Sequence, residues 1–173
     1  MIVTVRTNIL EEGWRDALAE YLLRSSRRVH LIGTGNRLRG DDAVGFYIVS
    51  QIARKCGDTL PDNIVLHPES VNPELEMSRL DLSREGLVIF DAIESDAKPG
   101  TILCAPLSDT RYSFFATHNI PLRMIPSLSS SADHVLVAGI QPLSMELGAG
   151  LSREVRSSAD MLVEAVSAII GVG

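Results

Sequence analysis

The sequence predicts an α/β protein: a three-layer α/β/α sandwich with a mostly parallel five-stranded sheet, in which one short edge strand can run antiparallel. Three observations lead to this fold class. Short apolar runs alternate along the chain with longer segments of helical period. Residues 87–90 form an uninterrupted apolar run, which is typical of a central strand covered on both faces. A glycine-rich loop at residues 33–45 joins an apolar run to a helical segment, as happens at the carboxyl edge of such a sheet.

Each strand of the predicted sheet is a short apolar run between polar connectors. The expected strands are residues 29–33, 63–67, 87–90, 101–104 and 134–140. The strand at 101–104 follows the turn Pro99-Gly100. It is the strand that can run antiparallel at an edge.

Apolar positions at helical spacing predict the helices between these strands. The expected helices are residues 9–24, 42–55, 73–80, 120–128 and 153–170. Asn72 and Ser152 are suited to N-caps and Gly57 to a C-cap. The apolar stripe of residues 9–24 favours a helix packed on its own domain, with a partner surface as the alternative.

The length of 173 residues suits one domain with a hydrophobic core. We expect residues 1–28 to be an N-terminal helical extension and residues 29–173 to form a single α/β domain. The net charge of -6 and the pI near 5.2 argue against nucleic acid as a partner. No apolar segment reaches the ~20 residues of a membrane helix, and the start lacks a signal-peptide layout, so we expect a cytoplasmic protein that does not contact a membrane.

The glycine-rich loop carries two adjacent carboxylates, Asp41 and Asp42, where the next helix begins. Such a loop often binds phosphate, because free N–H groups and the helix dipole attract an anion. Two carboxylates oppose that, and Leu38 stands where a dinucleotide-binding motif needs its third glycine. Two interpretations remain: Asp41 or Asp42 caps the helix, or the loop forms part of a cation site.

A cation site needs ligands from other strand ends, which converge at one edge of a parallel sheet. Asp42 follows the first strand, Asp91 follows the third, and His118 follows the fourth. Two carboxylates and an imidazole suit a divalent transition ion with open positions, or acid–base work on a polarised carbonyl. The alternatives are that Asp91 caps a turn and that His118 belongs to a capping network with Thr117 and Asn119.

Other titratable residues carry weaker signals. His67 and Glu69 also follow a strand and are minor candidates as ligands, whereas His30 and His134 lie in strands and suit structural roles. Two cysteines are too few for a disulfide framework or a thiolate metal cage. Neither cysteine adjoins a histidine and no G-x-S-x-G motif occurs, so nucleophilic catalysis has little support.

Several short motifs occur together in one order along residues 29–170. They are Gly33-x-Gly35-Asn36 with Asp41-Asp42, Phe90-Asp91-Ala92, Pro99-Gly100, Thr117-His118-Asn119, Gly139-Ile140-Gln141-Pro142 and Gly150-Leu151-Ser152. In this combination the chain resembles the [NiFe]-hydrogenase maturation endopeptidases. The stretch at 117–122 is similar to the subgroup that contains the hydrogenase 3 maturation protease.

This resemblance implies a metal-dependent endopeptidase of aspartic type. Such an enzyme removes the C-terminal extension of a [NiFe]-hydrogenase large-subunit precursor after nickel insertion. The family's metal-binding and catalytic positions fall on Asp42, Asp91 and His118. The nickel is expected to come with the substrate, and no organic cofactor is expected. Asp41 is then a helix-start residue, and the Asn36 side chain fixes the loop through hydrogen bonds.

The sequence departs from the family at His67-Pro68-Glu69-Ser70-Val71, where relatives carry an Asp-Gly-Gly-like loop expected to contact substrate. Two other functions stay open at this stage. One is a non-catalytic nickel- or precursor-binding chaperone on the same scaffold. The other is a nucleotide-binding enzyme that uses the glycine loop. We expect a monomer or a weak dimer.

Overall fold

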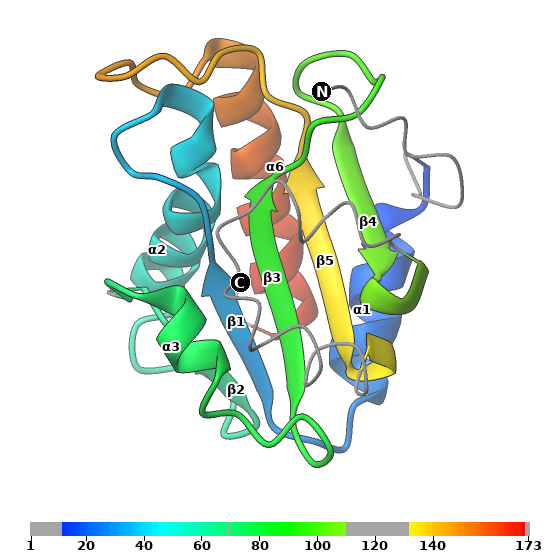
Figure 1. The fold of residues 1–173 in the computed structure, drawn as a ribbon. Helices are drawn as coiled ribbons and strands as arrows, with labels where there is room; N and C mark the ends of the chain where they lie inside the picture. The colour runs from blue at the N-terminus through cyan, green and yellow to red at the C-terminus, as the bar shows by residue number, and fades with distance from the viewer. Residues whose placement is uncertain (1–11, 69, 110–131, 172–173) are drawn as a thin grey trace.

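A five-stranded sheet with the strand order β2-β1-β3-β5-β4 forms the centre of the computed structural model, which describes residues 12–68, 70–109 and 132–171 (Figure 1). The strands are β1 (Val29–Gly33), β2 (Ile64–Leu66), β3 (Gly86–Ala92), β4 (Ile102–Pro106) and β5 (Val135–Ile140). The α-helices are α1 (Trp14–Arg24), α2 (Val44–Cys56), α3 (Pro73–Met77) and α6 (Arg153–Ile169). Short 3₁₀ helices span Gly40–Ala43 (η1), Leu107–Asp109 (η2) and Ala132–His134 (η4).

The sheet confirms the predicted fold class. Strands β1, β2, β3 and β5 pair in parallel, and β4 pairs antiparallel with β5 at the edge. The turn before β4 is held to the end of β5, because Gly100 N–H donates to Gln141 O (2.8 Å) and Gln141 N–H donates to Thr101 O (2.9 Å). The chain order reverses between β1 and β3, so the carboxyl ends of these two strands flank the point where open α/β sheets bind ligands.

The two faces of the sheet are covered unequally. Helices α1, α2 and α6 lie on one face and α3 on the other (Figure 1). Along β3, Val88 and Phe90 pack into the larger cluster, whereas Leu87 and Ile89 pack into the smaller one that contains Met77 of α3. This alternation explains why residues 87–90 of the central strand are all apolar.

Helix α1 packs on its own domain, as the apolar stripe predicts. Leu18 and Leu22 are buried in the cluster that also holds α2 and α6. The Tyr21 hydroxyl donates to His134 O and accepts from Leu87 N–H (3.0 Å). The helix is therefore fixed to the amino ends of β3 and β5.

Several boundaries differ from the sequence prediction. Strand β3 runs through Asp91 to Ala92, and α3 ends at Met77 instead of residue 80. A 3₁₀ turn, η1, precedes α2, so the α-helix begins two residues later than predicted. The helix predicted at 120–128 lies outside the described residues. Within the described ranges, no helix is both long and apolar enough to span a membrane.

Candidate active site

The start of α2 packs directly against the sheet between β1 and β3. A Cβ atom at Gly45 would lie 2.1 Å from Phe90 O and 2.6 Å from Thr34 O, so only glycine fits there. Thr34 N–H donates to Phe90 O (2.9 Å), which continues the β1–β3 pairing beyond the end of β1. The glycine loop is thus placed against the carboxyl end of β3, next to Asp91.

Asp91 is buried, with 1 % of its surface exposed, and both carboxylate oxygens accept hydrogen bonds. Thr34 Oγ1 donates to Oδ2 (2.5 Å) and Ala92 N–H donates to Oδ1 (2.7 Å). The contact with Ala92 is local, as the turn-capping alternative expects. The contact with Thr34 joins Asp91 to the glycine loop, and capping does not explain it.

Asp42 is half-buried in η1 and lies against Gly35. A Cβ atom at Gly35 would meet Asp42 O at 1.9 Å and Asp42 Oδ1 at 3.3 Å, and its φ of 114° also requires glycine. Asn36 N–H donates to Asp42 O (3.1 Å). The loop therefore folds back over Asp42 at the carboxyl edge of β1.

Neither of the two carboxylates belongs to the N-cap residue of a helix. The N-cap residues of η1 and α2 are Arg39 and Ala43, and neither helix receives a side-chain cap. Asp41 lies in the first turn of η1, as a helix-start residue would, but its carboxylate is directed elsewhere.

Asp41 is fully buried and holds the loop that follows β5. Its Oδ2 accepts from the N–H groups of Leu143 (2.9 Å) and Ser144 (3.0 Å), and its Oδ1 accepts from Ser152 N–H (2.6 Å). Ser152 Oγ also donates to Asp41 Oδ2 (3.0 Å) and accepts from Val155 N–H (3.4 Å) as the cap of α6. Sequence reasoning missed this role, because the donors lie about a hundred residues further along the chain.

Asn36 fixes the glycine loop, as predicted. Its side-chain oxygen accepts from Leu38 N–H (2.9 Å), and its backbone oxygen accepts from Arg39 N–H (3.1 Å). These bonds form a local Asx turn, which favours the loop conformation over continued strand or helix.

The third predicted ligand, His118, lies outside the described residues. Within residues 12–68, 70–109 and 132–171, no group of three or more His, Cys, Asp or Glu side chains is placed to hold a metal ion. The structure therefore locates two carboxylates of the predicted set, Asp42 and Asp91, and the complete set stays a prediction.

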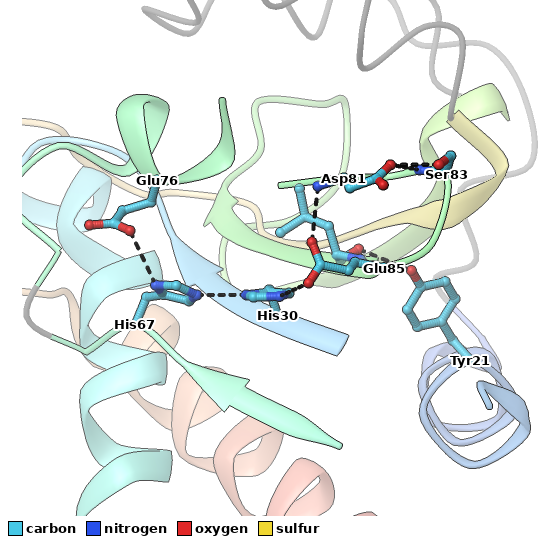
Figure 2. Close-up of polar contacts among 8 residues, drawn as sticks. Tyr21, His30, His67, Glu76, Asp81, Ser83 and Glu85 are labelled. Atoms are coloured by element: carbon cyan, nitrogen blue, oxygen red, sulfur yellow. Dashed lines mark hydrogen bonds and ion pairs between the residues drawn. The ribbon is translucent and has the colours of Figure 1, made fainter. Parts of the chain in front are cut away.

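His67 belongs to a separate chain of side chains, shown in Figure 2. Its Nε2 lies 2.9 Å from His30 Nδ1, and its Nδ1 lies 3.7 Å from Glu76 Oε2. His30 Nε2 lies 3.3 Å from Glu85 Oε1. Burial, assisted by the nearby His30, lowers the pKa of His67, and Glu76 opposes this shift. Both ring nitrogens of His67 thus face other side chains of this series, His30 and Glu76. Glu69, the other minor candidate ligand, lies outside the described residues.

The remaining histidine and the cysteines have structural surroundings. His134 lies at the end of η4 instead of in β5, and its Nδ1 is 2.6 Å from Leu82 O, whereas His30 is buried within β1. These surroundings agree with structural roles for both. Cys56 and Cys104 are buried free thiols. Burial raises the pKa of Cys104 to about 12, so this thiol is a poor nucleophile.

A pocket of about 400 Å³ opens beside the candidate site, between the loops that follow β3 and β5. Residues 94–96 line one side and residues 141–145 the other. Ser95 N–H and Oγ donate to Gln141 Oε1 (2.6 and 2.8 Å), which ties the two loops together. The residues on one side of the pocket closely follow Asp91 in sequence. Those on the other side include the loop that the Asp41 carboxylate holds.

Together, the fold and the site define an open α/β domain with two carboxylates, one buried and one half-buried, at the carboxyl edge of its sheet. A family model described as hydrogenase maturation protease matches residues 73–169, more than half of the chain. Two proteins of Methanocaldococcus jannaschii, each named provisionally as a hydrogenase maturation protease, are also similar. One is 31% identical over 145 residues (79% of this chain, 92% of the relative) and the other is 27% identical over 155 residues (86% and 91%). The chain belongs to the hydrogenase maturation protease family.

Solved structures agree with this fold. The [NiFe] hydrogenase maturation protease HycI from Thermococcus kodakarensis superposes with a TM-score of 0.67 at 24% identity, covering 87% of this chain and 97% of that one. A hydrogenase 3 maturation protease superposes with a TM-score of 0.60 at 26% identity, covering 80% and 88%. The similarity thus extends over most of the described chain.

Proposed function

We propose that this protein is an endopeptidase that removes the C-terminal extension of a [NiFe]-hydrogenase large-subunit precursor after nickel has been inserted. One observation carries the proposal. In a member of this family, Asp42 and the buried Asp91 lie on adjoining segments at the point where the order of the parallel strands reverses. That point is where open α/β sheets place their ligands.

Asp42, Asp91 and His118 are proposed to bind the nickel that the precursor carries. Oxygen and imidazole ligands suit a divalent ion, and three protein ligands leave positions for groups of the substrate. A bound ion of this kind polarises a carbonyl and so assists hydrolysis. Thr34 is a positioning residue in this proposal, because its hydrogen bond holds one oxygen of Asp91.

The glycine loop supports a cation site over a phosphate site. Gly35 lies against the carboxylate of Asp42, so a phosphate group at this loop would meet a like charge. The net charge of the chain has the same sign. We therefore do not propose a nucleotide-binding function.

The test is release of a C-terminal peptide from the purified precursor. The full-length protein is incubated with nickel-loaded and with nickel-free large-subunit precursor, and the masses of the products are measured by mass spectrometry. We expect the nickel-loaded precursor to lose its C-terminal peptide and the nickel-free precursor to stay intact. A stable complex without any peptide release would instead identify a precursor-binding chaperone, and equal cleavage of both precursors would refute nickel-based recognition.

A further inference from the structure

Large apolar side chains that are exposed to solvent concentrate at the edge of the sheet that carries the candidate site. Among the described residues, Leu38 (68 % exposed), Val71 (98 %), Leu143 (55 %) and Leu147 (77 %) follow the carboxyl ends of β1, β2 and β5. Exposed apolar groups that gather in one region of a soluble protein mark an interaction surface. We refer to these four side chains as the apolar rim.

The loop after β2 is fixed to the glycine loop by Arg37. Its guanidinium group stacks over the Phe46 ring (4.1 Å) and donates to Pro68 O (3.4 Å) and Ser70 O (3.5 Å). Ser50 Oγ of α2 also donates to Pro68 O (3.4 Å). Val71 is therefore presented next to a segment whose backbone is tied to α2 and to the glycine loop.

The loop after β5 is fixed to the glycine loop on the other side. Arg39 and Leu147 form an antiparallel β-bridge, and Gly148 N–H donates to Leu38 O (2.7 Å). The Asp41 carboxylate also accepts the hydrogen bonds described above, from three backbone N–H groups of this loop and from the Ser152 hydroxyl. The three loops thus form one connected frame, which lowers the entropy lost when a partner binds to it.

We propose that the apolar rim is the surface on which the large-subunit precursor docks as a folded protein. This inference rests on the proposed function. The rim extends from the loop after β2 to the loop after β5, three strand spacings apart, which is roughly 14 Å. That span exceeds the width of a single extended peptide. The rim is therefore wide enough to contact the surface of the precursor on both sides of the segment that is cleaved. A second copy of this chain seated there would cover the half-buried Asp42, which the proposed reaction needs accessible.

The test compares rim variants with an exposed apolar control outside the rim. Leu38→Ser, Val71→Ser and Leu147→Ser are made singly and together, and Leu23→Ser is the control, because Leu23 is 68 % exposed on α1 away from this edge. The rate of peptide release is measured over a range of concentrations of nickel-loaded precursor. Circular dichroism verifies that each variant is folded.

We expect the triple variant to raise KM about tenfold or more, with kcat at saturating precursor retained, because each lost apolar contact weakens binding. Leu23→Ser should leave both constants unchanged. An unchanged KM in the triple variant overturns the inference. So does a loss of self-association in sedimentation experiments with KM unchanged, which would make the rim an interface between copies.

The proposed function and this inference fail in different ways. If the wild-type protein releases no peptide, the proposed function fails. In that case, calorimetric titration of the precursor into the wild-type and triple-variant proteins still tests the rim. Equal affinity of the two proteins would then refute the rim separately.

Discussion

Two adjacent carboxylates of one loop have different roles. Asp41 is buried and saturated by backbone and hydroxyl donors of the loop after β5, whereas Asp42 is half-buried beside Gly35. A buried carboxylate is retained only where hydrogen bonds replace water, and Asp41 meets this condition. Sequence alone marked both residues as special. The family resemblance implied a metal-site role for Asp42 and a helix-start role for Asp41. It could not show what the Asp41 carboxylate holds, because the donors to Asp41 become its neighbours only in the folded chain.

Asp41→Asn should destabilise the protein by about 1–3 kcal/mol, because its amide group would face N–H donors that a carboxylate satisfies. Urea unfolding followed by circular dichroism measures the change. Asp62→Asn is the matched control, since Asp62 is exposed and lies away from the site. An unfolding midpoint equal to that of the wild type would show that Asp41 does not hold the loop.

His67 should make stability depend on pH. Burial lowers the pKa of His67 in the folded chain, so the folded state takes up a proton less readily than the unfolded state. The free energy of unfolding should therefore fall as pH falls below the ordinary histidine pKa of about 6.5, and level off below the lowered pKa. Urea unfolding between pH 7.5 and 5 checks this.

His67→Gln isolates this contribution. The other three histidines and all carboxylates remain in the variant. Over the same pH range, the variant should lose less stability than the wild type. Parallel curves for the two proteins would show that protonation of His67 does not oppose folding.

At the scale of elements, sequence periodicity predicted most of the fold. Each described strand lies within two residues of its predicted range, and α2 and α6 follow their apolar stripes. Strand boundaries and strand directions were predicted less well where tertiary contacts determine them. Strand β3 continues through Asp91 because this residue pairs with Gly139 of β5, and neither residue carries a strong strand preference. The antiparallel direction of β4 was left open for the same reason, since pairing with β5 determines it.

The contact between α2 and the sheet depends on Gly45. Gly45→Ala should destabilise the protein by about 3 kcal/mol or more, because its Cβ atom would meet two backbone oxygens that cannot move aside locally. Gly150→Ala is the control, since nothing lies within 4 Å of the added carbon. Thermal unfolding compares the two variants. A melting temperature of Gly45→Ala equal to that of Gly150→Ala would contradict the close approach of α2.

At the scale of the whole molecule, the strand order explains why one edge carries the chemistry. The glycine loop and Asp91 flank the reversal between β1 and β3, and the pocket lies beside them between the loops after β3 and β5. The sequence predicted this convergence from the α/β pattern alone. It could not predict the pocket or the apolar rim, because both depend on how separate loops are hydrogen-bonded to one another.

Asp42, Asp91 and His118 are proposed to act together on the nickel-loaded precursor. A single-turnover cleavage assay with excess enzyme tests it most directly, on Asp42→Asn, Asp91→Asn, His118→Gln and the control Asp62→Asn. We predict that each of the three site variants lowers the cleavage rate by about 10²-fold or more while remaining folded, and that Asp62→Asn cleaves at the wild-type rate. Cleavage at the wild-type rate by Asp91→Asn or His118→Gln would show that the three residues do not act together in the reaction.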